Sequence, residues 1–170
     1  MSKTLWYLFH PYADNASVNL KLLKMAKHRL PEVKFVDLSR GQNYCVKEQQ
    51  KNMEEADTIV FQYPVFWFSK PFDLSEFIAK TWIPGWCYLG GEALKGKKLI
   101  TVSSTASSFD IYNNRDILPY GINENKNEWD SAAVFVGAKS LKHLNLYSAK
   151  EASDEQLEAH IDSIIAAINE

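Results

Sequence analysis

The stretch TIVFQY, residues 58–63, followed at once by Pro64, decides how the whole chain is interpreted. A short apolar run that is rich in β-branched and aromatic residues and stops at a proline is typical of a buried strand. Short runs of similar composition, without a proline directly after them, recur at four other places: TLWYLF at 4–9, VKFVDL at 33–38, KLITVS at 98–103 and KHLNLY at 142–147. The sequence therefore predicts five short strands spread along the chain.

The segments between these strands are predicted to be helices, because their apolar residues recur mainly at helical spacing. Residues 18–30 end before Pro31, and a later helix opens at Pro71, a position where the missing N–H costs little. The last helix begins with Ser153 and Gln156, which have the spacing of a capping box. The remaining helices are expected at 46–56 and 128–137, whereas the stretch 104–127 shows no clear periodicity.

Strands that alternate with helices form parallel sheets with right-handed crossovers. Five strands and five helices match a doubly wound α/β sheet in the order 2-1-3-4-5, and residues 1–170 are expected to form one such domain. In this order a ligand binds beyond the carboxyl ends of the strands, where strands one and three diverge. The loops that follow the first, third and fourth strands therefore form the candidate site.

The composition argues against several other classes of protein. The net charge of −2 comes without a dominant basic patch, so we expect no nucleic-acid partner. The two cysteines lie far apart and the histidines lack metal-ligand spacing, so we expect free thiols, a cytoplasmic location and no metal. We expect neither a signal peptide nor a membrane span. Aromatic residues make up 13% of the chain and could serve as core, as a dimer face or as walls for a planar ligand.

The loop after the first strand runs from His10 to Asn19 and leads into a helix N-terminus. Free N–H groups and the helix dipole favour an anion there. Ser17 and Asn19 could add side-chain donors, and His10 could bring an imidazole to a phosphate. The alternative is that Ser17 or Asn15 simply caps the helix. No G-x-G-x-x-G turn and no Walker loop is present, so neither of those phosphate motifs applies.

The loop after the third strand, residues 64–71, reads PVFWFSKP and holds three consecutive aromatics between two prolines. A stiff backbone with flat side chains suits a planar heteroaromatic ring, whose polar edge could accept hydrogen bonds from the loop's N–H groups. The alternatives are a dimer face or ordinary core. The loop after the fourth strand, residues 103–108, carries small hydroxyl side chains. It could bind the other end of the same ring or be an ordinary flexible loop.

Four segments give the chain a resemblance to the flavodoxin-like NAD(P)H:quinone oxidoreductase family. This family includes the DT-diaphorases and the flavin-binding ancillary subunits of glutathione-gated potassium efflux systems. The resemblance extends over roughly residues 3–102, and the second and fourth segments together are the most specific. The segments are His10-Pro11 followed by Ser17-Val18-Asn19, then FQYPVFWFSKP at 61–71, WIPGWCY at 82–88 and GGEALKGKK at 90–98.

The resemblance implies a flavodoxin-like fold, a bound flavin and a homodimer with its sites at the interface. FMN is favoured over FAD, because the chain lacks the longer C-terminal region of the FAD enzymes. NAD(P)H would reduce the flavin and leave, and a quinone or a similar small acceptor would then take both electrons in a ping-pong cycle. The flavin supplies this chemistry, and the protein orients and tunes it.

The resemblance also assigns residues to parts of the site. His10, Ser17, Val18 and Asn19 would hold the phosphate side. Trp86 and Tyr88 would lie near the substrate, reaching from a partner subunit, and Tyr112 would assist proton transfer as the catalytic tyrosine. The flavin ring would be lined by Pro64, Val65, Phe66, Trp67 and Phe68 on one side and by Ser103, Ser104, Thr105 and Ala106 on the other.

Two departures from the family pattern bear on these expectations. Ala16 stands where the family has a hydroxyl residue, so one phosphate donor is missing. The family's glycines after the fourth strand are replaced by Thr105 and Ala106, whose side chains would crowd a flavin unless the loop moves. Two alternatives therefore stay open: a flavin-binding regulatory subunit that contacts a membrane transport protein of a potassium efflux system, and a degenerate member that has lost flavin.

Overall fold

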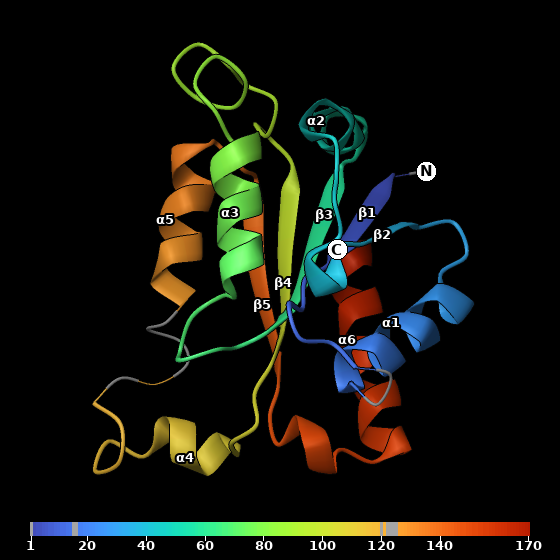
Figure 1. Cartoon of the computed structure of the whole chain (residues 1–170), viewed down its shortest axis with the longest axis vertical. Coiled ribbons are helices and arrows are strands. Elements are labelled where there is room, and N and C mark those ends of the chain that lie inside the picture. The colour runs from blue at the N-terminus through green and yellow to red at the C-terminus, as the bar shows by residue number, and fades with distance from the viewer. Residues whose placement is uncertain (1, 15–16, 120, 122–125) are drawn as a thin grey trace.

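The computed structural model describes residues 2–14, 17–119, 121 and 126–170. Its centre is a five-stranded, all-parallel sheet in the order β2-β1-β3-β4-β5, as the alternation of strands and helices predicts (Figure 1). The register pairs Leu5 with Ile59 and Ile59 with Leu99. The strands are β1 (Thr4–Leu8), β2 (Lys34–Asp37), β3 (Thr58–Pro64), β4 (Lys98–Ser104) and β5 (Ser140–Leu146).

Helices cover both faces of the sheet, which makes a three-layer α/β structure (Figure 1). On one face, Trp6 and Val60 pack with Leu22 of α1 and Ile161 of α6. The side chains that alternate with them contribute to a second cluster on the other face, under the remaining long helices. These helices are α1 (Val18–Arg29) and α6 (Asp154–Asn169), and α2 (Val46–Glu55), α3 (Phe72–Thr81) and α5 (Asn127–Phe135).

The strand boundaries differ slightly from the prediction at the carboxyl edge. Pro64 continues β3 instead of only ending it, since its partner in the ladder is Ser104 and the next N–H, that of Val65, donates to Ser104 O at 2.8 Å. Within the described ranges, three short helices were not predicted: η1 (Ser39–Gly41), α4 (Phe109–Asn113) and η3 (Ala149–Glu151). Each has five residues or fewer, too few to show helical periodicity.

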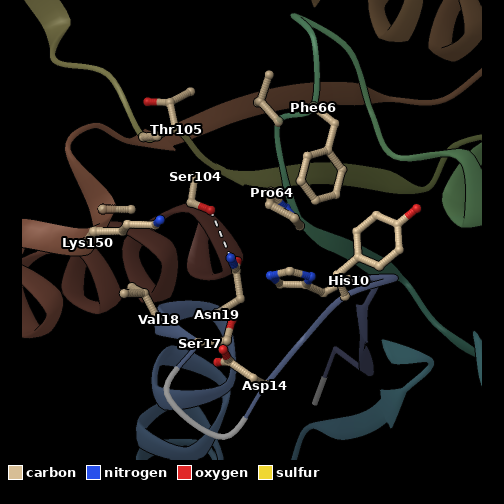
Figure 2. Close-up of a pocket in the computed structure, with 14 residues that line it drawn as sticks. His10, Asp14, Ser17, Val18, Asn19, Pro64, Phe66, Ser104, Thr105 and Lys150 are labelled. Atoms are coloured by element: carbon tan, nitrogen blue, oxygen red, sulfur yellow. Dashed lines mark hydrogen bonds between the residues drawn. The ribbon is translucent and has the colours of Figure 1, made fainter. Parts of the chain in front are cut away.

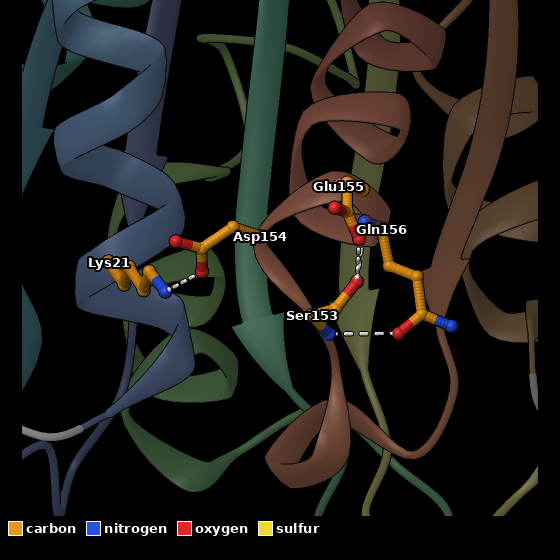
Figure 3. A network of polar contacts seen from close by, with 5 residues as sticks. All are labelled: Lys21, Ser153, Asp154, Glu155 and Gln156. Atoms are coloured by element: carbon orange, nitrogen blue, oxygen red, sulfur yellow. Dashed lines mark hydrogen bonds and ion pairs between the residues drawn. The ribbon is translucent and has the colours of Figure 1, made fainter.

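The start of α6 has the capping box that the sequence predicts (Figure 3). Ser153 Oγ accepts from the Gln156 backbone N–H at 3.3 Å, and Gln156 Oε1 accepts from the Ser153 N–H at 2.9 Å. Beside it, Asp154 forms an ion pair with Lys21 of α1. These contacts fix where α6 begins relative to α1, next to the carboxyl edge of the sheet.

The two edges of the sheet carry different segments (Figure 1). The loops after β1, β3 and β4, together with α4, lie at the carboxyl edge. The segment 82–97, between α3 and β4, lies at the amino edge, where Lys97 Nζ donates to the carbonyls of Glu54 and Ala56. Among the described residues, no helix combines the length and the apolar character needed to cross a membrane.

Candidate functional site

A cavity of about 500 Å³ opens at the carboxyl ends of β1, β3 and β4, where the strand order predicts a ligand (Figure 2). All three candidate loops contribute side chains to its wall. Most residues assigned to flavin binding line it: His10, Ser17, Val18, Asn19, Pro64, Val65, Phe66, Ser104, Thr105 and Ala106.

Ser17, at the N-terminus of α1, is one of the residues that line this cavity. Ser17 occupies the N-cap position, but its side chain makes no capping hydrogen bond. Its Oγ atom is buried and has no hydrogen-bond partner among the described residues. The interpretation of Ser17 as a simple helix cap is therefore wrong. Asn15, the alternative cap, and Ala16, the missing donor, lie outside the described residues.

His10 lines the cavity with a second unpartnered atom. Its Nδ1 is buried and lacks a hydrogen-bond partner among the described residues. Burial lowers the pKa of the imidazole, and the nearby Asp14 carboxylate opposes that shift. The ring therefore favours its neutral form at pH 7 and can act as a hydrogen-bonding group. It also contacts the Phe66 ring edge-on, with the centroids 6.0 Å apart.

A buried chain of hydrogen bonds runs beneath the cavity. Trp6 Nε1 donates to Gln62 Oε1 at 2.9 Å, and Gln62 Nε2 donates to the backbone O of Asn19 at 2.8 Å. Asn19 Nδ2 donates in turn to Ser104 Oγ at 2.8 Å, as Figure 2 shows. The first turn of α1 is thus tied to β3 and β4, which holds its N–H groups against the cavity.

The aromatic loop after β3 forms a tight turn. Phe66 and Ser69 exchange two backbone hydrogen bonds of 3.0 Å, so that Trp67 and Phe68 occupy the two central positions. Both central residues have positive φ, 46° and 65°, a conformation that Asn-Gly or Gly-Gly normally supplies. Neither side chain lines the cavity, and that of Trp67 is 93% exposed. Strain of this kind in bulky residues is typical of a functional loop.

The far end of this loop is anchored to α5. Lys70 Nζ pairs with Glu128 Oε2 at 2.5 Å, and the lysine side chain is only 16% exposed. Ser69 Oγ donates to the same carboxylate at 3.4 Å. The next residue, Trp129, donates from Nε1 to the hydroxyl of Tyr63 at 2.9 Å. The first turn of α5 therefore holds both the end of β3 and the loop that follows it.

The loop after β4 keeps the cavity open although it lacks glycines. Thr105 is buried, and its hydroxyl donates away from the cavity to Ser107 O at 3.2 Å. The volume of about 500 Å³ is the space that remains with the side chains of Thr105 and Ala106 in the wall. Ser103 does not line the cavity, because its side chain points to the other face of the sheet and donates to Asn145 Oδ1 at 2.8 Å.

The three residues predicted to be catalytic do not line the cavity in this chain. Tyr112, on α4, is buried and packs against Phe68 with the ring centroids 5.9 Å apart, which brings it next to the aromatic turn. Trp86 lies at the opposite edge of the sheet, where its Nε1 donates to Glu54 Oε1 at 2.6 Å. Tyr88 belongs to the same segment and contacts Phe135. Only another subunit could bring these last two to a flavin.

Comparison with known proteins shows which family the chain belongs to. The family model described as a flavodoxin-like fold matches residues 2–168. The chain belongs to this flavodoxin-like family. The resemblance drawn from the four sequence segments is thereby confirmed at the level of the family.

Three similar proteins show how far the likeness extends. The uncharacterized NAD(P)H oxidoreductase YdeQ of Bacillus subtilis (strain 168) is 31% identical, over 91% of this chain and 80% of its own. A thermophilic tryptophan halogenase from Streptomycin violaceusniger is 26% identical, with a TM-score of 0.85 over 98% of both chains. General stress protein 14 of Treponema denticola, solved with FMN, is 24% identical, with a TM-score of 0.83 over 98% of both chains. These proteins differ in named activity, so the activity of this flavodoxin-like chain has to be argued from its cavity.

Four cavity residues of this flavodoxin-like chain escaped the sequence prediction: Tyr12, Asp14, Ala149 and Lys150. Tyr12 and Asp14 lie inside the loop 10–19, but neither belongs to a sequence motif that would have singled it out. The other two belong to η3, after β5. Because β5 pairs with β4 in parallel, the loop after β5 ends at the same edge of the sheet. The strand order alone could therefore have pointed to this fourth loop.

Proposed function

We propose that this chain is an FMN-dependent NAD(P)H oxidoreductase. The observation that carries the proposal is the cavity with two buried, unpartnered polar atoms, Ser17 Oγ and His10 Nδ1, beside the N-terminus of α1. Unpaired buried polar atoms cost about 1–3 kcal/mol each, so a site that leaves them open is suited to a ligand that satisfies them. A phosphate fits, because the helix N-terminus favours an anion and the hydroxyl can donate to it.

The rest of the cavity fits the ring of a flavin. Pro64, Val65 and Phe66 form an apolar wall on the β3 side. On the β4 side, the Ala106 N–H makes no hydrogen bond with a described residue and can donate to the polar edge of a ring. The binding of FMN by the general stress protein of Treponema denticola, which has nearly the same fold, supports this choice of cofactor.

FMN, when bound, would accept a hydride from NAD(P)H and pass two electrons to the acceptor. The chain's own residues would bind and orient it and shield its buried face from water. Tyr112 is the candidate proton donor to the acceptor, since burial raises the pKa of its hydroxyl and keeps it protonated at neutral pH. Its contact with Phe68 holds it beside the aromatic turn.

We assign quinones or similar small acceptors to this site, with a two-electron ping-pong cycle. The support is the family resemblance and an aromatic mouth in which Tyr12, Phe66 and Phe72 lie in edge or tilted contact at 6.0 and 6.3 Å. Planar acceptors pack well on such rings. The free thiols Cys45 and Cys87 fit a reducing cytoplasm.

The proposal is tested with the purified chain. We expect FMN to bind at micromolar concentration or tighter, with quenching of flavin fluorescence. NADPH or NADH should bleach the bound flavin under anaerobic conditions, and initial rates with a quinone should give parallel double-reciprocal lines. Absence of FMN binding would overturn the proposal and favour a member that has lost flavin. Bound flavin that neither nucleotide reduces would favour a regulatory subunit that acts on a membrane transport protein.

We also propose that the chain works as a homodimer. Trp86 and Tyr88 lie at the edge of the sheet opposite the cavity, and exposed apolar side chains of Leu89, Val134 and Phe135 surround that region. A second subunit that covers this patch could receive Trp86 and Tyr88 at its own cavity. We expect a dimer mass by light scattering, and a Trp86→Ala chain should regain activity when mixed with a chain impaired only at the cavity. A monomer with full activity would contradict this arrangement.

A further inference from the structure

Lys150 is the only lysine or arginine among the described residues that line the cavity. It lies in the middle of η3, the turn between β5 and α6. Figure 2 shows its side chain extended toward Asn19 and Ser104, across from the N-terminus of α1. Its ammonium group forms no hydrogen bond or ion pair with any described residue.

The backbone that carries Lys150 is held firmly at the carboxyl edge. Ala149, its neighbour, is buried, and the Ala149 N–H donates to Thr105 O at 2.9 Å. The Ser148 N–H donates to Ser107 O at 3.1 Å, which joins the same turn to the loop after β4. On the other side, the capping box at Ser153 fixes the start of α6 (Figure 3). The backbone position of Lys150 is therefore fixed by hydrogen bonds on both sides of the residue.

Two acidic residues at the start of α6, which follows Lys150 in the chain, have partners of their own. Asp154 pairs with Lys21 of α1, and Glu155 accepts a hydrogen bond from Ser153 Oγ at 3.1 Å. An ammonium group that a fixed turn presents to a cavity, and that has no ion-pair partner in the part of the chain that the structure describes, is available to an anion that enters there.

The other groups around the cavity supply little positive charge, so a bound phosphate would depend on Lys150. His10 favours its neutral form because burial lowers its pKa, and Asp14 adds a carboxylate to the wall. The helix N-terminus offers only about half an elementary charge. A phosphate monoester carries about −1.5 to −2 charges at neutral pH, so the site needs a full positive charge to hold it well.

We infer that Lys150 binds the phosphate group of the cofactor and makes the site select FMN over riboflavin. This inference rests on the proposed function and assigns the fourth loop a role in it. Riboflavin has the same ring and ribityl chain but no phosphate, so only the FMN complex would gain from the ammonium group.

The test compares the dissociation constants of FMN and riboflavin for four chains: wild type, Lys150→Gln, Lys150→Arg and the control Lys24→Gln. Lys24 is an exposed residue of α1 away from the cavity, so this control removes the same charge. We expect Lys150→Gln to weaken FMN binding about tenfold or more and to leave riboflavin binding unchanged. Lys150→Arg should restore most of the FMN affinity, and Lys24→Gln should match wild type.

Salt gives a second readout that does not depend on activity. The affinity of wild type for FMN should fall with rising salt, and Lys150→Gln should show a shallower dependence. Equal losses for FMN and riboflavin, or no loss for either, would overturn the role of Lys150 while leaving the proposed function intact. Failure of the wild-type chain to bind FMN at all would overturn the proposed function and this inference together.

Discussion

Asn19 donates a hydrogen bond from its Nδ2 to Ser104 Oγ at 2.8 Å and thereby joins the first turn of α1 to the last residue of β4. Both side chains line the cavity, and both residues are largely buried. The phosphate end of the proposed site is built on α1 and the ring end partly on β4. Together with the hydrogen bonds from Gln62 to Asn19, this contact therefore links the two ends of the site.

Ser104→Ala should lower both stability and FMN affinity. The substitution leaves the buried Asn19 Nδ2 without its acceptor, which should cost about 1–3 kcal/mol of the free energy of unfolding. We expect FMN to bind severalfold more weakly, because the first turn of α1 is less well fixed. Urea unfolding and FMN titration measure the two effects. Ser163→Ala is the control, since the Ser163 hydroxyl bonds only its own helix, and its effect should stay within about 0.5 kcal/mol.

Changing the turn Trp67-Phe68 to Asn-Gly should stabilise the chain and weaken its function. The two large residues hold positive φ angles of 46° and 65°, at a cost of about 1–3 kcal/mol each. Asn-Gly adopts this turn without strain, so we expect a higher urea midpoint with an unchanged m-value. Turnover of the acceptor should weaken, because loss of the Phe68 ring removes the contact that holds Tyr112 beside the turn, whereas FMN affinity should change little because neither side chain lines the cavity. A fall in stability would show that the aromatics stabilise the loop more than their backbone strains it.

The order of strands and helices could be predicted from the sequence because the apolar runs are short and well separated, and because Pro31 and Pro64 mark the ends of a helix and a strand. The periodicity of residues 18–30 and the capping box at Ser153 located α1 and α6 to within a residue or two. The segment 104–127 resisted prediction because α4 has only five residues, and its cap at Ser108 is a single hydroxyl in a run of hydroxyls.

Only the part of the site that lies on the loops with recognisable motifs could be predicted from the sequence. The residues of loops 10–19 and 64–71 could be named from their motifs, but a motif does not say which way a side chain points. Ser103 turns to Asn145 because neighbouring strand residues face opposite sides of the sheet. Lys150 was missed because an isolated lysine carries no local signal, and only the pairing of β5 with β4 brings it to the cavity.

FMN binding should become tighter as the pH falls from 8 to about 6.5. Burial lowers the pKa of His10 in the free chain, and a bound phosphate dianion would raise it again, so that binding takes up protons. Affinity therefore rises as protons become more available, by roughly three- to tenfold over this range. The phosphate stays largely dianionic above its own pKa of about 6, which keeps the range interpretable. His10→Asn should flatten the dependence.

Riboflavin is the matched ligand for this experiment, because it has no phosphate to interact with the imidazole. Its dissociation constant should stay nearly constant between pH 8 and 6.5 in both the wild-type and the His10→Asn chains. If riboflavin showed the same pH dependence as FMN, His10 would have to act on the ring end of the cofactor.

The free energy of unfolding should fall as the pH drops below about 6.5, and His160 on α6 should account for part of the loss. Burial lowers the pKa of this imidazole from 6.5 to about 4, and its Nε2 has no hydrogen-bond partner among the described residues. Between these two values the unfolded chain binds the proton and the folded chain does not, so stability rises with pH across this window. The full shift corresponds to about 3 kcal/mol.

The substitution His160→Leu isolates the contribution of His160 to the pH dependence of stability, because leucine fills a similar space but has no titrating group. The variant should lose less stability than wild type between pH 6.5 and 4.5, as followed by urea unfolding at each pH. His10 and His143 keep some dependence of the same sign, since burial lowers their pKa values too, whereas the raised pKa of the buried Asp73 acts in the opposite direction. His28→Gln, an exposed change on α1, serves as the control and should follow wild type. If the free energy of unfolding depended on pH in the same way for His160→Leu and wild type, His160 would have the same pKa in the folded and unfolded chains, and this prediction would be wrong.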